Sequence, residues 1–463
     1  MTHSHSTKGK SQSRNKGAEK NSPKITPGAV LRAQVAEAVT AVERDGRTID
    51  WVVEKDQYNI TNPLAAELLF GTIRRYLSLA RYLADHLHKP LKKKDRALYN
   101  LLLVGTYQLL HTDIARHAAI NETVSACDHL NRSWAKGMVN AILRKVSKLP
   151  KSNYHHLEET EQTFDHPQFL AELITQQYPE AGLELLRANN TRAPMWLRDN
   201  SVESTLTSGL TQQDVTFELE PHAGAIKLDH PCRATSLPGW NEGHCSVQDL
   251  GAQLAFNIHQ QLSNTSSPTV LDACCAPGGK LFHLLLKNPA ISKHLALEKS
   301  APRMKTTLNE ATRLGLSLNI KQADATDIDA WWQGELYDAV LADVPCSGTG
   351  TIRRHPDIKL LLKAKDIERH QKTQVRLLET LWQTVQKNGY LLYSTCSVLK
   401  EENDDVIAQF LKDRKDAQIR PFSLPYGHAT EFGIQTTPID GMTDGFYYCA
   451  LTKHSTASTG ASS

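Results

Sequence analysis

Two cysteines follow predicted strands in an arrangement that suits covalent chemistry. Asp343 ends one strand and precedes Val-Pro and Cys346, whereas Cys396 directly follows the next strand. A thiolate that adds to carbon 6 of cytosine makes carbon 5 electron-rich enough to accept a methyl group from a sulfonium donor. A thiol with an ordinary pKa is only about 3% ionised at pH 7, so the site must promote its deprotonation. Because an anionic Asp343 would oppose this beside the sulfur, we expect its carboxyl group at N3 of the base.

A second set of residues could hold a cofactor. Glu298 ends a predicted strand, where a carboxylate can accept both hydroxyl groups of a ribose, and Asp324 follows the next strand and could accept an adenine amino group. The preceding loop has neither of the common glycine-rich phosphate patterns, which favours a nucleoside without phosphates. Asp343 continues this series of acidic strand ends. The loop residues that we expect at the cofactor are Cys274, Cys275, Ala276, Pro277, Gly278, Gly279 and Lys280.

These residues require a sheet that brings strand ends together. Short apolar runs alternate with helical stretches from residue 269 onward, which predicts a parallel sheet covered by helices on both faces. Ligands of such sheets bind at the carboxyl ends of the strands. The predicted strands are 269–273, 294–298, 318–322, 337–342 and 389–395, and the predicted helices lie near 280–287, 301–314 and 365–387.

The pattern of apolar and polar residues divides the rest of the chain into further units. Helical periodicity with no strand-like alternation predicts an all-α domain, with helices that include 63–86, 95–111, 119–131 and 134–147. Short strands at 195–197, 215–219 and 225–228 indicate a small α+β module. The predicted division is a flexible basic tail at 1–26, the helical domain at 27–150, the α+β module at 151–240, a Rossmann-like domain at 241–453 and a flexible tail at 454–463.

Composition limits what else the chain can be. The 463 residues carry a net charge of +3, but the first 26 have six basic residues against one glutamate, which leaves the remainder about −2. A nucleic-acid surface must therefore be a local patch. Without a run of 18 apolar residues or an apolar leader, we expect a soluble cytoplasmic chain with no membrane contact. Eight cysteines with no paired C-x-x-C spacing argue against disulfides and a metal site.

Three basic clusters are candidates for RNA contacts. Charge runs are usually solvated faces, and we interpret the first two clusters in that way. The third lies beside the presumed catalytic loop and is expected to contact phosphate. The clusters are Lys92-Lys93-Lys94 with Arg96, Arg74-Arg75, and Arg353-Arg354.

Several motifs in a fixed order resemble one known family. They include Val247-Gln248-Asp249, the Cys274–Lys280 loop, Asp343–Gly350, Arg353–Asp357, Thr395-Cys396-Ser397 with Glu401-Glu402-Asn403, and Asp444–Tyr448. Over residues 28–453 the chain looks like the bacterial RsmB (Sun/Fmu) family of ribosomal RNA cytosine-C5 methyltransferases. Residues 117–124 and Arg74-Arg75 resemble the NusB-like RNA-binding domain of these enzymes. Cys275, Val344 and Glu298 depart from the usual family residues without removing a required group.

The resemblance implies a reaction and roles. Cys396 attacks carbon 6, Cys346 assists product release, S-adenosylmethionine is the cofactor, and 16S ribosomal RNA is the partner of a monomeric enzyme. The target cytosine must be unpaired or flipped to reach a strand-end cleft. Exchanged cysteine roles, as in DNA cytosine methyltransferases, remain possible. So do action on transfer RNA or another ribosomal cytosine, and a non-catalytic assembly factor. Phe446 and Tyr447 either line the base pocket or belong to the core, and Trp331 and Trp332 are expected in the core.

Overall fold

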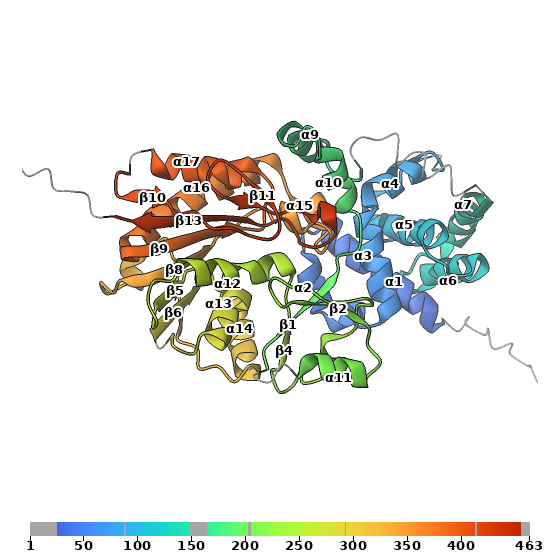
Figure 1. The fold of residues 1–463 in the computed structure, drawn as a ribbon. Helices are drawn as coiled ribbons and strands as arrows, with labels where there is room; N and C mark the ends of the chain where they lie inside the picture. Colours follow the sequence, from blue (N-terminus) through green and yellow to red (C-terminus); the bar gives the residue numbers. More distant parts are fainter. Residues whose placement is uncertain are drawn as a thin grey trace, which may run out of the picture.

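The computed structural model describes residues 26–87, 89–148, 150, 164–201, 205–291, 293–412 and 414–454. Apart from Thr26 and His454, the two tails predicted to be flexible lie outside these residues. A helical unit forms one end of the molecule and a large sheet covered by helices forms the other, with a small sheet beside the junction (Figure 1). Within the described ranges, no helix has the length and apolarity that a membrane span requires.

The helical unit is built around one apolar core, to which every one of its α-helices contributes. The helix predicted at 63–86 is two helices, because the chain leaves helical geometry at Arg75. The carboxylate of Asp165 accepts a hydrogen bond from the backbone of Ser78 at 2.7 Å, which provides the second helix with a cap from a distant part of the chain. The helices are α1 (Pro27–Glu43), α2 (Ile49–Val53), α3 (Pro63–Arg74), α4 (Tyr76–Ala84), α5 (Arg96–His111), α6 (Arg116–His129) and α7 (Lys136–Lys148).

The small module is an antiparallel sheet of four strands in the order β2-β3-β1-β4. One of these strands, β4 (Cys245–Val247), lies beyond the boundary predicted at residue 240 and pairs with β1 (Met195–Asp199). The other strands are β2 (Phe217–Leu219) and β3 (Ile226–Leu228), and the helices of this region are α9 (Gln168–Gln177), α10 (Gly182–Ala188) and α11 (Leu206–Gln212).

The large sheet is mixed, which corrects the prediction of a purely parallel sheet. Five parallel strands follow the order β9-β8-β5-β6-β7, and antiparallel strands extend the sheet beyond β9. The parallel strands are β5 (Thr269–Asp272), β6 (Lys293–Glu298), β7 (Ile320–Gln322), β8 (Tyr337–Asp343) and β9 (Val385–Thr395). The antiparallel strands are β10 (Ala417–Ile419), β11 (His428–Ala429), β12 (Ile434–Gln435) and β13 (Tyr447–Lys453).

Helices cover this sheet largely where the sequence predicts them. The helix predicted at 365–387 is an exception, because it ends at Leu381 and strand β9 already begins at Val385. A polar stretch with Asn388 at a positive φ of 63° starts that strand, and it carries no strand-like alternation. The covering helices are α12 (Leu250–Leu262), α13 (Gly279–Lys287), α14 (Ala301–Arg313), α16 (Ala364–Leu381) and α17 (Asp404–Leu411), whereas the short α15 (Ile358–Leu361) packs against α1 of the helical unit.

The helical unit is fixed to the large domain through buried polar contacts. Lys359 donates to the carbonyl oxygen of Arg74 at 2.5 Å and to Asn190 at 2.7 Å, so one ammonium group joins three parts of the chain. Asp357 accepts a hydrogen bond from the backbone of Ile49 at 3.0 Å. These contacts come from the segment that directly follows the Cys346 loop, so the helical unit is anchored next to the candidate site.

Candidate active site

The parallel strands deliver their polar residues to one edge of the sheet. Asp272 ends β5, Glu298 ends β6, Asp343 ends β8, and Cys396 directly follows β9. The strand order changes direction between β5 and β8, and ligands of open α/β sheets bind outside the strand ends at such a point. The predicted site residues therefore meet around the switch point.

The two predicted cysteines are in contact. Their sulfur atoms lie 3.4 Å apart, although the residues are 50 positions apart in the chain. The loops that carry them are joined by a hydrogen bond from the backbone of Gly350 to the carbonyl oxygen of Cys396, at 2.9 Å. The hydrogen bond to Cys396, together with burial, raises the pKa of Cys346 well above its usual value. The protonated form of Cys346 is therefore favoured, and the geometry of the contact allows either sulfur to act as the donor.

A buried carboxylate below the two cysteines joins the residues that follow them. Glu402 is fully buried and accepts hydrogen bonds from the hydroxyl groups of Ser347 and Ser397, each at 2.5 Å. It also accepts the backbone N–H of Ser347 at 2.8 Å. Glu402 appeared in the sequence only within a family motif, and no spacing rule pointed to this contact.

Lys280 is predicted in the cofactor loop, but its ammonium group points to the reacting residues. It forms an ion pair with Asp343 at 2.7 Å and lies 5.2 Å from the ring centre of Phe446. Burial acts to lower the pKa of Lys280, but the charge of Asp343 and, more weakly, that of Cys396 raise it overall. The ammonium group thus compensates the Asp343 charge, which would otherwise oppose ionisation of the nearby thiol.

A cavity of about 900 Å³ lies at the strand ends and reaches Pro345, the neighbour of Cys346, although neither Lys280 nor Asp343 lines it. Cys274, Glu298 and Asp324 line it, together with apolar side chains and a basic face of helix α16. Although partial burial opposes this, hydrogen bonds from Lys299 and Thr326 lower the pKa of Asp324 to about 2, so its carboxylate is charged. Two carboxylates and apolar walls fit the ribose and adenine of S-adenosylmethionine. Within the described parts of the chain, no group of His, Cys, Asp and Glu side chains could hold a metal ion.

The loop leading into helix α13 is shaped by its glycines. Gly278 adopts a φ of +103°, and a Cβ atom there would lie 2.2 Å from the ring of Phe282. Cys275 is buried and donates its backbone N–H to Leu297 at 3.0 Å, while Arg303 donates to the carbonyl oxygen of Ala276 at 2.6 Å. The loop is therefore held against strand β6. Pro277 lies between Ala276 and Gly278, and the carbonyl oxygen of Gly279 accepts a hydrogen bond from Arg198 at 2.8 Å.

Asp272 is a site residue that the sequence reading missed. It is 2% exposed, and burial together with the nearby Asp343 charge raises its pKa to about 7. Its backbone neighbour Cys274 donates to it at 3.3 Å. Its position at the end of the first strand indicates a site residue, as the same position does for Glu298 and Asp343.

The expectation of a phosphate contact is wrong for Arg353, which is buried, whereas the side chain of Arg354 is 25% exposed and its contact with phosphate stays a prediction. Arg353 is 1% exposed and pairs with Asp444 at 2.5 Å, and Arg354 pairs with Asp249 at 2.6 Å and with Asp444. These ion pairs hold the segment that follows Cys346 against the motifs that contain Asp249 and Asp444. The interpretation of Arg74-Arg75 as a solvated face also fails for Arg74, because its guanidinium group is buried and donates to the carbonyl oxygen of Arg353 at 3.1 Å.

The aromatic residues near the site belong mainly to the core. Tyr447 is fully buried and donates to Asp404 at 2.7 Å, so it packs rather than lines a base pocket. Phe446 is 7% exposed and lies under the Lys280 ammonium group. Trp331 is buried and Trp332 partly buried against the same core, as expected.

Comparisons with known proteins cover all three units. Residues 259–452 match the family described as 16S rRNA methyltransferase RsmB/F, residues 29–148 match the NusB family, and residues 166–235 match the RsmF/B-like ferredoxin-like domain. The probable ribosomal RNA small subunit methyltransferase B of Coxiella burnetii is 38% identical over 84% of this chain and 92% of its own length. The corresponding protein of Pseudomonas syringae is 40% identical over 84% and 89%.

Solved structures support the same fold. The crystal structure of PH0851 has a TM-score of 0.77 at 23% identity and covers 92% of this chain and 99% of its own. NSun6 from Pyrococcus horikoshii has a TM-score of 0.56 at 16% identity and covers 62% and 98%. At these identities the similarity concerns the fold alone.

Proposed function

Because this chain belongs to the ribosomal RNA small subunit methyltransferase B family, we propose that it methylates carbon 5 of a cytosine while the Cys396 sulfur is covalently bonded to carbon 6 of that base. The chain is a ribosomal RNA methyltransferase by membership of this family. The contact of 3.4 Å between Cys396 and Cys346 at adjacent strand ends carries the proposal for the mechanism.

The first step is addition of the Cys396 sulfur to carbon 6 of the base. We place the attacking thiolate on Cys396, whose sulfur lies 3.4 Å from that of Cys346 and close enough to Lys280 to act on its charge. Electrons of the carbon 5–carbon 6 double bond move toward N3, where we place Asp343. A proton reaches N3 from Lys280 through its 2.7 Å contact with that carboxylate, and the same proton returns to Lys280 when the ring double bond is restored at the end of the reaction. Carbon 5 thereby becomes the nucleophile.

S-adenosylmethionine supplies an electrophilic methyl group when it is bound. Glu298 and Asp324 would hold the ribose and adenine in the cavity, and Cys274 and Pro345 line it on the side of the cofactor loop and of Cys346. We propose that the rest of the Cys274–Lys280 loop and Asp343 complete the cofactor site. This assignment leaves the carbon 5 face of the base next to the cavity.

Cys346 then resolves the adduct. Two causes of its raised pKa, the hydrogen bond and the charge of Cys396, disappear once Cys396 is bonded to carbon. Cys346 can then give its proton to water and, as a thiolate, remove the proton on carbon 5, which leaves Cys346 protonated again. The electron pair of that C–H bond restores the ring double bond, the bond between carbon 6 and sulfur breaks, and Cys396 leaves as thiolate. The roles of the two cysteines are therefore sequential.

The substrate of this proposal is an unpaired or flipped cytosine of 16S ribosomal RNA. A base in a stacked duplex cannot reach sulfur atoms at the bottom of a strand-end cleft. We propose further that the enzyme acts as a monomer in the cytoplasm.

Trapping of the adduct tests the proposal. Purified variants are incubated with small-subunit RNA and S-adenosylmethionine and separated on a denaturing gel, and modified cytosines are mapped by bisulfite sequencing. We expect Cys346→Ala to accumulate a covalent protein–RNA band and Cys396→Ala to give neither band nor modification.

The exposed Cys232 provides the control, because Cys232→Ala should behave like the wild type. A trapped band with Cys396→Ala and none with Cys346→Ala would exchange the two roles. Undiminished methylation by Cys396→Ala would exclude the covalent mechanism.

A further inference from the structure

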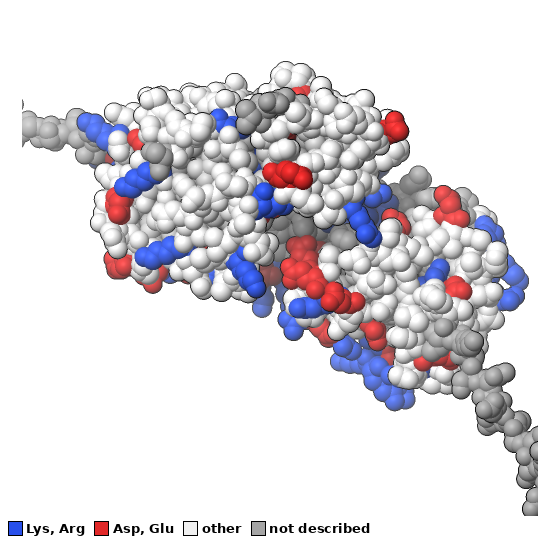
Figure 2. Space-filling view, turned by 90° about the horizontal axis from the view of Figure 1, so that it is seen from below, with Lys and Arg blue, Asp and Glu red and all other residues white. Residues whose placement is uncertain are grey.

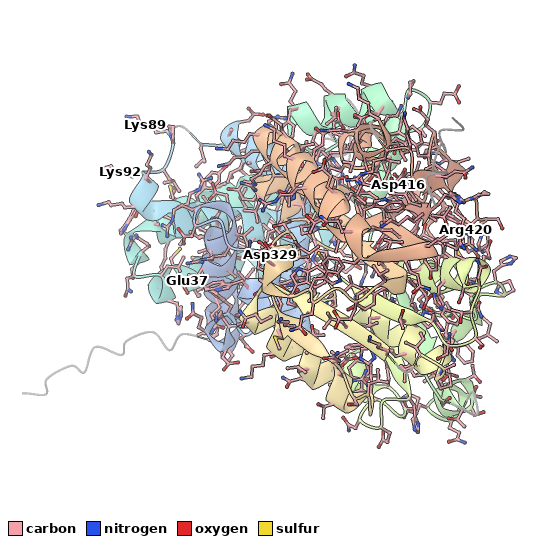
Figure 3. All side chains as sticks on the ribbon, turned by 90° about the vertical axis from the view of Figure 1, so that its left-hand side faces the viewer. Glu37, Lys89, Lys92, Asp329, Asp416 and Arg420 are labelled. Carbon is pink, nitrogen blue, oxygen red and sulfur yellow. The ribbon has the colours of Figure 1, made fainter. Side chains whose placement is uncertain are left out.

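A groove of about 980 Å³ crosses the surface of the helical unit. It lies between the connection from α4 to α5 and helix α7, with Leu91, Met138 and Ile142 forming an apolar floor. Figure 3 shows Lys89 and Lys92, which line it, projecting at the opposite side of the molecule from Asp416 and Arg420 of the large domain. The groove is separate from the cavity at the strand ends.

The rim of the groove is positively charged. Lys89, Lys92, Lys94 and Lys145 line it with exposed side chains. Asp95 also lines the groove, but its carboxylate is paired with Arg132 at 2.7 Å. Among the described residues, no carboxylate forms an ion pair with any of the four lysines. Figure 2 shows one face of the molecule, on which acidic side chains gather near the centre with basic side chains around them, so charges of both signs lie together there.

An aromatic side chain stands open at the same rim. Trp134 is 64% exposed, more than any other large apolar side chain in the described part of the protein. Trp51 has cations over its ring and Trp240 has Arg313, whereas no described cation or ring stacks on Trp134. An indole left in water forgoes the free energy of burial, so its exposed face is available to a flat partner.

We propose that this groove binds an unpaired segment of the ribosomal RNA, with a base stacked on Trp134 and phosphates contacted by the lysines. The inference rests on the proposed function, because it adds a second contact to the same RNA. Single-stranded RNA is recognised by aromatic faces and cations placed together, which is the combination found here. An acidic peptide would satisfy the lysines but would leave the indole face without a flat partner.

The contact is remote from the reacting sulfurs, so it contributes to affinity rather than to chemistry. It should lower the dissociation constant for long RNA and leave the turnover number at saturating RNA unchanged. Its loss should also weaken the dependence of binding on salt, because each phosphate contact to a single strand contributes roughly 0.7 to the slope.

Filter binding of full-length small-subunit RNA to the full-length protein, between 50 and 200 mM salt at about 25 °C, tests the proposal. We expect Trp134→Ala to raise the dissociation constant about tenfold, in line with the loss of one stacked base. The double variant Lys92→Glu with Lys145→Glu should weaken binding and reduce the slope by about 1.4. The matched control reverses two exposed lysines of the large domain, Lys387 and Lys415, and should change the dissociation constant less than twofold.

Cross-linking identifies the occupant directly. RNA containing 4-thiouridine should form cross-links to peptides of residues 89–95 and 132–145 in the wild type, and Trp134→Ala should lose them. Unchanged RNA binding and absent cross-links would overturn the proposal and leave an acidic protein segment as the occupant. An equal loss of affinity in the control variant would overturn it as well. The Cys396→Ala variant separates this result from the catalytic proposal, because it should bind RNA through the groove without methylating it.

Discussion

The chemistry at the two sulfurs depends on where one proton resides. In the proposed mechanism Cys346 holds it, because the hydrogen bond to Cys396 and partial burial raise the pKa of its thiol, while Lys280 balances the charge of Asp343. The ion pair with Lys280 thereby compensates the negative charge of Asp343, which would oppose formation of a thiolate nearby. The same arrangement explains how two cysteines of identical chemistry can take different roles.

Glu402 should act as a positioning residue for both cysteines. Replacement by Gln removes an anion that accepts two hydroxyl groups and one backbone N–H, at about 1.5–3 kcal/mol for each bond to a charged group. Because the variant loosens the loops that carry the sulfurs, we expect turnover to fall roughly 10- to 100-fold. Single-turnover methylation at saturating RNA and cofactor measures this.

The neighbouring residue provides a control for Glu402. Glu401 accepts hydrogen bonds from Gln177 at 2.8 and 2.9 Å, away from the sulfurs, so Glu401→Gln should retain turnover. An unchanged dissociation constant for the cofactor in Glu402→Gln would locate the defect in the cysteine loops. Equal turnover in the two variants would contradict the positioning role.

Asp272 should make stability depend on pH. Its pKa in the folded protein is about 7, above the value near 3.9 in an unfolded chain. Between these values the folded state holds a proton that the unfolded state has lost, so the free energy of unfolding falls as pH rises and levels off above about 7. Relative to Asp272→Asn, the wild type should lose up to about 2 kcal/mol between pH 5 and 7. Urea unfolding of both proteins at pH 5, 6, 7 and 8 measures the difference, and parallel profiles would exclude this assignment.

At the scale of elements, the catalytic loop requires the close approach of two backbones. A Cβ atom on Gly350 would lie 2.0 Å from the carbonyl oxygen of Gly445, whose backbone N–H donates to Gly350 at 2.8 Å. This contact holds the Cys346 loop against the segment before strand β13. A side-chain rotation cannot relieve such a clash, because the atoms of Gly445 nearest to the Cβ position are all backbone atoms.

Gly350→Ala should therefore destabilise the protein and impair turnover together. We expect the free energy of unfolding to fall by about 1–3 kcal/mol or more, which is the usual cost of overpacking. Gly137 is the control, because its Cβ position in helix α7 is open, and Gly137→Ala should be neutral or stabilise by roughly 0.5–1 kcal/mol. Melting temperatures and methylation rates of the two variants test this prediction. Equal melting temperatures would contradict a steric clash at Gly350.

Local patterns predict elements better than they predict partners. The strand ends at Glu298 and Asp343 were found because apolar runs and punctuation mark strands. Strand β13 was missed because its antiparallel pairing with β9 is a contact between distant segments. The pairing of Arg353 with Asp444 spans 91 residues, so charge alone suggested phosphate instead. Side-chain direction, as for Lys280, depends on the packed structure and has no signal in a single sequence.

At the scale of the whole molecule, the helical unit is joined to the reaction centre by few but buried contacts. Lys359 is 2% exposed and bridges α3 to the module that contains Asn190, while its own helix α15 directly follows the catalytic loop. An RNA held by the groove and by the strand-end cleft would span both units. Rigid coupling through this lysine would keep the two contacts at a fixed separation.

Loss of Lys359 should uncouple the units. Lys359→Ala leaves two buried oxygen acceptors unsatisfied, which costs about 1–3 kcal/mol each, so we expect the calorimetric unfolding transition to broaden or split. The exposed Lys412 is the control, since Lys412→Ala should unfold like the wild type. Because the chemistry is untouched, Lys359→Ala should weaken binding of long RNA more than it slows turnover at saturation. A single sharp transition together with unchanged RNA affinity would show that Lys359 does not couple the units.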